Sequence, residues 1–280
     1  NAYLADITKP EDRAKAFGYM GAAFGLGFII GPAIGGILGE YGPRVPFFAP
    51  AGISILNFAY GYFVLPETLP PESRRSFSLT RSNPVGVFKF FSTYRQALPL
   101  CIVMAMYFFA TSVYPAIWAF WGIARFNWSE STIGFTLAVF GLITAIVQGG
   151  LTGPVVNCLG ERNTAILALV TSVIAAAGYG LATGMRMILI LFVIHAPEGF
   201  AQPALTALMS KDAQGELQGG IASAQNLALL AGTVMFAQIF GYFLQDGSPI
   251  QFPNMAYFIS AALCIAALAI FVGLTSRAPA

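Results

Sequence analysis

Long runs of apolar residues, separated by short clusters of charged residues, are the main pattern along this chain. A helix needs roughly 20 apolar residues to cross a bilayer. Eight runs meet that length: residues 16–39, 45–66, 96–124, 131–160, 163–185, 187–210, 217–245 and 247–276. The runs are continuous, whereas strands of a membrane barrel alternate apolar and polar residues. The pattern therefore predicts an all-α membrane protein with eight complete transmembrane helices.

The composition agrees with this prediction and excludes several other classes of protein. Of the 280 residues, 57% are hydrophobic and 9% are charged, whereas soluble domains have about 25% charged residues. The net charge of +2 gives no basic surface for nucleic acid. Cys101, Cys158 and Cys264 have neither a metal-binding spacing nor a disulfide pattern. We see no nucleotide-binding loop or pair of nucleophile and base, so we expect no enzyme activity, no cofactor and no bound metal.

The basic residues predict how the helices are oriented. Eight crossings place both ends of the chain on one side of the membrane. Of the 14 Lys and Arg residues, only Arg44, Arg125 and Arg186 fall on the opposite side. Because cytoplasmic loops are enriched in Lys and Arg, both ends are predicted to be cytoplasmic.

One long connection, rich in proline and basic residues, divides the chain. We predict that residues 1–66 are the end of an N-terminal six-helix bundle, containing the last part of helix 4 and helices 5 and 6. Residues 67–95 are predicted to be a cytoplasmic linker, and residues 96–280 a C-terminal bundle of helices 7 to 12. The sequence starts with Asn1 inside an apparent helix end, so we expect it to come from a longer protein with two facing bundles.

Glycines are dense in the first complete predicted helix. The string "GFIIGPAIGG" contains Gly27, Gly31, Pro32, Gly35 and Gly36. Three of these glycines recur every four residues, which is also typical of ordinary helix packing in membranes. The whole string resembles the fifth-helix antiporter signature of the major facilitator superfamily. The segments "PFFAPAGISILNFAYGYFVLPETL", "FNWSESTIGF", "TGPVVNCLGER" and "LQGGIASAQNLA" are similar to the tetracycline/proton antiporters and related drug exporters.

This resemblance implies a truncated major facilitator fold that exports a drug as protons enter. It also implies a gating turn after helix 8, at Gly153, Asn157, Gly160 and Arg162, with Asn157 where many members have aspartate. The central cavity would be lined partly by helices 7, 8, 10 and 11. The helix 8 histidine that is common in tetracycline exporters is replaced by Thr144. A proton carrier is therefore expected elsewhere.

His195 and Glu198 are the only ionisable residues deep inside a predicted span of this sequence. They are three residues apart, so they lie on one face of a helix. Burial disfavours the charged form of each group, whereas their mutual attraction favours the charged pair, so the pair is suited to exchange a proton. Pro197, Gly199 and Pro203 interrupt the same segment and predict a bend. The alternative is a static pair that satisfies backbone groups freed by the prolines.

Uncharged polar and aromatic residues supply candidates for a substrate cavity. The polar candidates are Gln148, Gln202, Gln225 and Asn226, and the aromatic ones are Tyr107, Tyr114 and Trp118. Each has an ordinary alternative role in packing between helices. Trp118, Trp121 and Trp128 also fit a belt of aromatic residues at the membrane surface, with packing inside the bundle as the alternative for the first two.

The sequence thus predicts a proton-coupled exporter of a small amphipathic drug such as tetracycline, in the inner membrane. Its expected partners are the substrate, protons and lipid, and we expect a monomer. Two alternatives stay open. One is a metabolite or sugar transporter of the same superfamily, and the other is a non-transporting scaffold or an inactive truncated remnant.

Overall fold

The computed structural model describes Thr8 and residues 13–66, 98–210, 216–245 and 247–276. Every regular element in these ranges is a helix. The chain divides into two compact units: unit 1 is Asn1–Leu79 with Trp128–Leu142, and unit 2 is Thr80–Asn127 with Ile143–Ala280. The linker predicted at residues 67–95 lies outside the described residues, so the predicted division into bundles stays a prediction.

The described residues of unit 1 include two helices and the start of a third. α2 spans Arg13–Gly39 and α3 spans Val45–Val64. Gly42, with φ of 130°, makes the tight turn between them, in a backbone region that favours glycine. No residue of α3 is buried, and large apolar side chains such as Phe63 stay exposed. This helix therefore presents apolar surface in all directions, as a membrane helix does.

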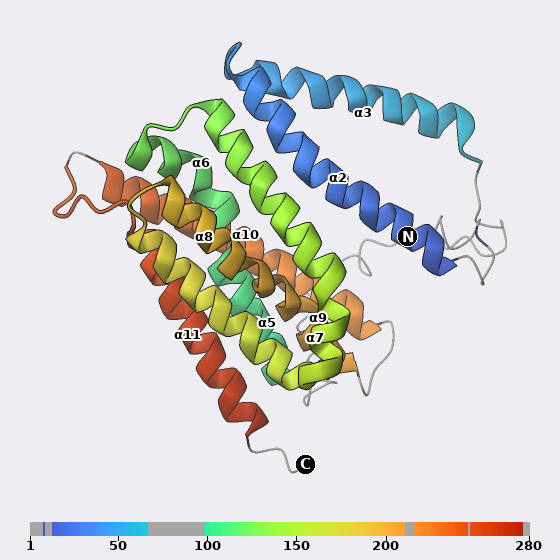
Figure 1. The fold of residues 1–280 in the computed structure, drawn as a ribbon, viewed down its shortest axis with the longest axis vertical. Helices are drawn as coiled ribbons and strands as arrows, with labels where there is room; N and C mark the ends of the chain where they lie inside the picture. Colours follow the sequence, from blue (N-terminus) through green and yellow to red (C-terminus); the bar gives the residue numbers. More distant parts are fainter. Residues whose placement is uncertain (1–7, 9–12, 67–97, 211–215, 246, 277–280) are drawn as a thin grey trace, which may run out of the picture. The chain divides into compact units, whose positions relative to one another are not determined.

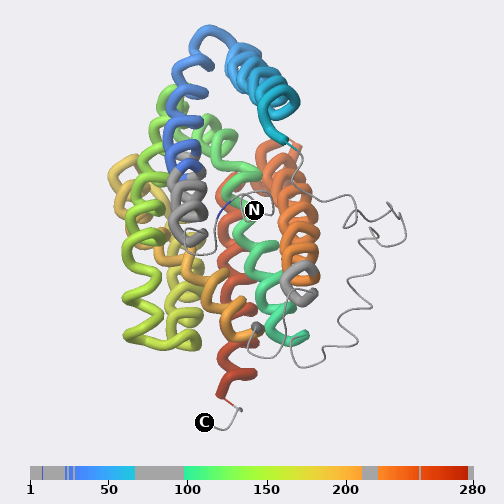
Figure 2. Tube along the Cα trace, turned by 90° about the vertical axis from the view of Figure 1, so that its right-hand side faces the viewer, coloured from blue at the N-terminus to red at the C-terminus, as the bar shows by residue number. Residues whose placement is uncertain are grey.

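Unit 2 is a bundle built around α5 (Figures 1 and 2). α10 and α11 make the most extensive contacts with α5. The elements are α5 (Leu98–Thr111), α6 (Val113–Phe126), the later part of α7 (Glu130–Leu181), α8 (Met185–His195), η3 (Ala196–Phe200), α9 (Ala201–Ser210), α10 (Glu216–Leu244) and α11 (Met255–Thr275). The core includes Met104, Leu169, Phe200 and Phe271.

Two spans of unit 2 are interrupted in the middle. The span Leu98–Phe126 is divided between α5 and α6 at Ser112. Pro115 follows one turn later, and its missing N–H removes a helix hydrogen bond. The span Met185–Met209 contains the 3-10 helix η3 between α8 and α9. The prolines and glycine of this segment thus coincide with a local change to 3-10 geometry, and the predicted bend stays a prediction.

The structure contains about six helices that could cross a membrane, counted over the described residues, rather than eight. Two predicted spans are joined in α7, which has 52 residues and is non-helical at Gly160. In Figures 1 and 2 the ribbon of α7 turns back part-way along its length. Within α2, Gly25–Gly39 is a shorter apolar stretch of the described residues. The eight helices are therefore not confirmed as separate elements.

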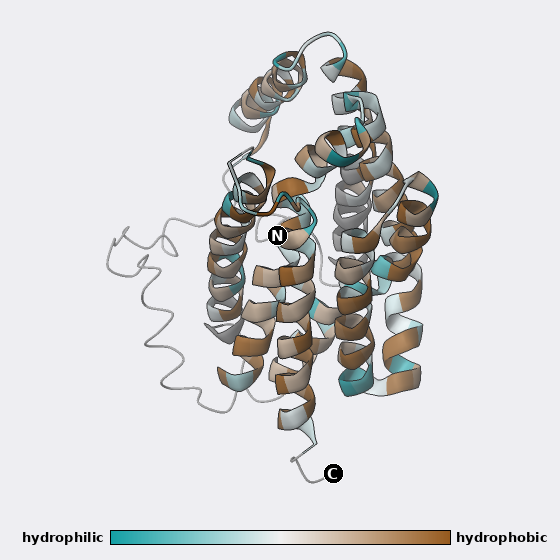
Figure 3. Cartoon of the chain, turned by 90° about the vertical axis from the view of Figure 1, so that its left-hand side faces the viewer, coloured by the Kyte–Doolittle hydropathy of each residue, from teal (hydrophilic) through white to brown (hydrophobic). Residues whose placement is uncertain are grey.

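Apolar residues cover most of the length of the helices, and strongly hydrophilic residues lie mainly near helix ends (Figure 3). Many large apolar side chains remain exposed, among them Phe120 at 64% and Leu230 at 65%. Exposed apolar surface on this scale is unusual for a soluble domain. It is expected where a bilayer or further helices cover the protein.

Candidate functional site

The ionisable pair predicted from the sequence lies in the core of unit 2. His195 is the last residue of α8, and Glu198 is in η3. The distance between His195 Nε2 and Glu198 Oε2 is 3.0 Å. The residues are only 5% and 7% exposed. Buried ionisable groups need partners, and each member of this pair supplies one for the other.

Two tyrosines from other helices contact the pair. Tyr179 of α7 has its hydroxyl 3.0 Å from His195 Nδ1. Tyr107 of α5 donates its hydroxyl both to Glu198 Oε1, at 3.3 Å, and to the Glu198 backbone carbonyl, at 3.2 Å. Tyr179, His195, Glu198 and Tyr107 therefore form a continuous polar chain across three parts of the bundle.

Aromatic rings pack closely around this polar chain. The Tyr114 ring centroid is 4.4 Å from that of His195. Tyr179 packs against Trp118 and Tyr257, with centroid distances of 5.3 and 5.8 Å. The surroundings are thus largely apolar, so any charge on the pair interacts strongly with its few polar neighbours.

Several buried polar atoms in this region have no hydrogen-bond partner among the described residues. They are the Tyr114 and Tyr257 hydroxyls, Thr144 Oγ1 and Glu198 Oε2. Glu198 Oε2 lies near the imidazole, but not in hydrogen-bond geometry. One carboxyl oxygen thus accepts a hydrogen bond from Tyr107, whereas the other is left to its pairing with His195.

The other predicted cavity residues fall into two groups, the polar candidates, which are mostly exposed, and the aromatic candidates, which lie in the packed core. Gln148, Gln202 and Asn226 are exposed, and Gln225 donates its amide to Met104 Sδ at 2.6 Å. Gln148 also packs on η3, because a Cβ at Gly199 would overlap its amide. In contrast, the aromatic candidates Tyr107, Tyr114 and Trp118 lie in the packed core around the pair. The structure brings these aromatic residues to His195 and Glu198.

The tryptophans of α6 pack inside the bundle. Trp118 is 7% exposed and Trp121 is fully buried. The Trp121 indole donates to Asn254 Oδ1 at 2.8 Å, and Asn254 Nδ2 donates to the Gly180 carbonyl at 2.9 Å. Of the two roles open from the sequence, the structure supports packing within the bundle. Sequence analysis did not single out Tyr179 or Asn254, because neither forms a local pattern with its partners.

Within unit 1, the glycine-rich segment of α2 makes a close helix contact at Gly36, which is next to the predicted glycine stripe but not part of it. Within this unit, nothing lies within 4 Å of a Cβ placed at Gly27, Gly31 or Gly35. A Cβ at Gly36 would lie 2.8 Å from the Glu130 carbonyl oxygen and 2.9 Å from Gly134 Cα. The close approach between α2 and the start of α7 therefore depends on Gly36.

The predicted gating turn coincides with the break in α7. Gly160 has φ of 75° and ψ of 164°, which permits the chain to turn back. Its carbonyl accepts a hydrogen bond of 2.8 Å from the Thr164 hydroxyl. Gly153, Asn157 and Arg162 are exposed around it. The sequence signature thus marks a real turn between two helical segments.

Comparison with known proteins places the chain in a family. The model of the Major Facilitator Superfamily matches residues 1–237. The chain belongs to the major facilitator superfamily. It is therefore a multi-pass membrane protein of a transporter family and not an enzyme.

The chain is similar to drug-resistance members of the superfamily. It is 34% identical to the tetracycline resistance protein, class C, of Escherichia coli, over 99% of this chain and 70% of that protein. It is 32% identical to multidrug resistance protein 2 of Bacillus subtilis (strain 168), over 88% of this chain and 61% of that protein. It also spans only 61% of the tetracycline resistance protein, class G, of Vibrio anguillarum, at 33% identity.

A solved structure has the same fold. The crystal structure of the human organic anion transporter MFSD10 (TETRAN) matches with a TM-score of 0.66, over 96% of this chain and 66% of that chain. Because the two sequences are only 21% identical, this likeness shows the fold alone.

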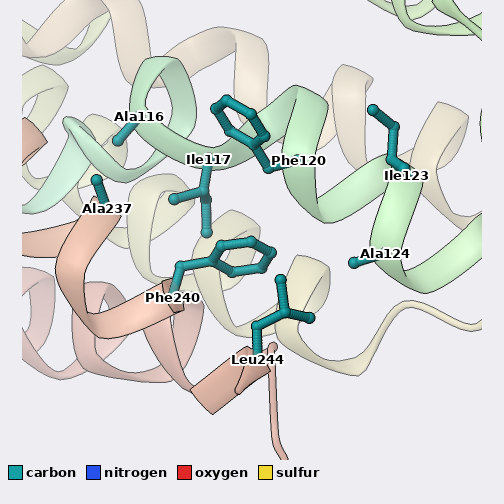
Figure 4. Close-up of a pocket in the computed structure, with 8 residues that line it drawn as sticks. All are labelled: Ala116, Ile117, Phe120, Ile123, Ala124, Ala237, Phe240 and Leu244. Carbon is teal, nitrogen blue, oxygen red and sulfur yellow. The ribbon is translucent and has the colours of Figure 1, made fainter. Parts of the chain in front are cut away.

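This chain also has an apolar pocket of about 380 Å³ between α6 and α10, apart from the buried pair (Figure 4). Its lining residues are Ala116, Ile117, Phe120, Ile123, Ala124, Ala237, Phe240 and Leu244. None of them was a predicted site residue, and none can ionise. The described residues also contain no cluster of His, Cys, Asp or Glu that would hold a metal.

Proposed function

We propose that the full-length protein exports a small amphipathic drug, such as tetracycline, in exchange for protons. Membership of the superfamily and similarity to tetracycline and multidrug resistance proteins support this proposal. The observation that carries it is the buried pair of His195 and Glu198, 3.0 Å apart within a membrane span. Intramembrane ionisable pairs are costly and typically serve proton or ion pathways.

We further propose eight crossings, with both ends of the chain cytoplasmic in an inner membrane. α7, at 52 residues with a break at Gly160, is long enough for two crossings of a hydrocarbon core about 30 Å thick. α2, with 27 residues, is proposed as one more crossing. Two crossings by α7, one by α2 and one by each of the other five spans give eight. The distribution of basic residues then supports cytoplasmic ends.

In this proposal Glu198 carries the proton. It holds the proton while the site is closed and releases it to water when the site opens toward the cytoplasm. His195 adjusts the proton affinity of its neighbour. The drug binds to the exposed polar residues Gln148, Gln202 and Asn226, separately from the buried pair.

The test is uphill drug transport by the full-length protein in vesicles with an imposed proton gradient. Glu198→Gln keeps the size of a protonated side chain but cannot release a proton. We expect it to lose uphill transport while drug binding and exchange at equal pH survive. His195→Asn should have a milder effect. Wild-type accumulation by Glu198→Gln would place coupling elsewhere.

A second measurement separates transport from the alternative functions. Adding tetracycline to energised vesicles should release protons if the protein is an exporter, whereas a scaffold or inactive remnant would give no signal. A sugar that gives the proton signal where tetracycline does not would favour the metabolite transporter.

A further inference from the structure

We infer that Tyr107 is a positioning residue that transmits the protonation of Glu198 to the backbone of η3. The inference rests on the proposed role of Glu198 as the proton carrier. It also changes the role expected for Tyr107 from the sequence, where this tyrosine was a candidate for the substrate cavity wall.

The geometry of the Tyr107 hydroxyl is the starting point. Its oxygen is 3.3 Å from Glu198 Oε1 and 3.2 Å from the Glu198 backbone carbonyl. Both distances exceed the usual 2.7–2.8 Å for an O–H···O bond. A phenol has one hydrogen to donate. The single O–H is therefore shared between a side-chain acceptor and a backbone acceptor of the same residue.

The charge of Glu198 decides between these two acceptors. An ionised carboxylate is a stronger acceptor than a neutral carboxyl group. When the carboxylate binds a proton, a new O–H bond forms on Glu198 and the negative charge disappears. Tyr107 keeps its own proton throughout, and its donation moves from Oε1 to the backbone carbonyl. No other bond is made or broken in this step.

The backbone carbonyl in question belongs to the interrupted segment. The Glu198 carbonyl already accepts the N–H of Ala201, at the junction between η3 and α9. A carbonyl has two lone pairs, so it can accept from Tyr107 as well. Each change of protonation thus changes the hydrogen bonding at the point where the span Met185–Met209 departs from α-helical geometry. α5, which bears Tyr107, is joined to that point.

Tyr107 is the neighbour whose hydrogen bonding depends on the charge of the Glu198 carboxyl group. Among the described residues, the side chains in contact with the pair include Tyr107 of α5, Tyr114 of α6 and Tyr179 of α7. Tyr257 of α11 packs against the rings of Tyr114 and Tyr179. Among the described residues, only Tyr107 donates a hydrogen bond to the Glu198 carboxyl. Tyr179 instead holds the far side of the imidazole, at Nδ1.

The decisive variant is Tyr107→Phe in the full-length protein, with Tyr257→Phe as the matched control. Both substitutions remove a buried tyrosine hydroxyl and keep the ring, but the Tyr257 hydroxyl has no hydrogen-bond partner in the described part of the chain. In proteoliposomes with an imposed proton gradient, we expect Tyr107→Phe to reduce uphill tetracycline accumulation about tenfold or more. This factor corresponds to the loss of one hydrogen bond to a charged group. Tetracycline binding and exchange at equal pH should stay within about twofold of wild type. Tyr257→Phe should pump normally.

A spectroscopic measurement tests the contact itself. Infrared difference spectra between two pH values should contain a carboxyl band that is absent in Glu198→Gln. We expect this band to shift in Tyr107→Phe and to stay in place in Tyr257→Phe.

The outcomes distinguish this inference from the proposed function. If Glu198→Gln loses uphill transport but Tyr107→Phe keeps it with an unshifted band, the inference alone is wrong. Weaker tetracycline binding by Tyr107→Phe with an unchanged proton-to-drug ratio would return Tyr107 to the cavity wall and overturn the inference. If Glu198→Gln pumps like wild type, the coupling role of Glu198 fails and the inference fails with it.

Discussion

Asn254 connects three helices by two buried hydrogen bonds, and replacing it should destabilise the bundle measurably. Its side chain accepts from the Trp121 indole at 2.8 Å and donates to the Gly180 carbonyl at 2.9 Å. Asn254→Leu keeps the number and branching of the side-chain heavy atoms but removes both bonds. Hydrogen bonds between membrane helices average about 0.6 kcal/mol and reach about 1.7 kcal/mol each. We therefore expect the free energy of unfolding to fall by about 1 to 3 kcal/mol.

The assay is reversible unfolding of the full-length protein in mixed micelles, arranged as a double-mutant cycle with Trp121→Phe. Trp121→Phe should cost clearly less in the Asn254→Leu background than alone, because the shared bond is already lost. The matched control is Asn226→Leu, at an exposed position, which should change stability by less than about 0.5 kcal/mol. Equal costs of Trp121→Phe in both backgrounds would refute the proposed link between the two side chains.

Three further predictions concern other parts of the chain. Gly36→Leu should reduce stability and transport more than Gly35→Leu, because a Cβ at Gly36 would meet the α7 backbone whereas a Cβ at Gly35 has open space within unit 1. Equal thermal unfolding of the two variants would contradict this packing. Cys158, which is exposed, should react with an impermeant thiol reagent in inside-out vesicles but resist it in intact cells, and labelling from outside would reverse the proposed orientation. Gly160→Ala should cost about 1 kcal/mol of unfolding free energy, because φ is 75°, whereas Gly153→Ala, in open helix, should be neutral or stabilising.

Local sequence patterns predicted the pair and the interruption of its helix well. His195 and Glu198 are three residues apart, and a helix turn brings such residues together whatever the surrounding fold. The prolines of the same span similarly act on their own turn of helix. In each case the relevant distance along the chain is only a few residues.

Contacts between distant helices could not be predicted in the same way. Tyr179 is 16 residues from His195 and Tyr107 is 91 residues from Glu198, and a tyrosine in an apolar run does not reveal which helix it faces. The same limit applies to the choice of Gly36 over its neighbours in the glycine stripe. Knowing these contacts requires the rotation and depth of each helix, which packing of the whole bundle determines.

The interruptions in two spans of unit 2 have a mechanical consequence. A straight helix moves as one rod, so a tilt that opens one face of the membrane also moves the opposite end. The span Leu98–Phe126 consists instead of two 14-residue rods, α5 and α6, joined at Ser112. Each rod is about 21 Å long, so a bend of about 10° at the joint displaces its tip by roughly 4 Å. A bend at Ser112 would let one half move at one membrane face while the other half keeps its packing, and a bend at η3 would do the same for the span Met185–Met209.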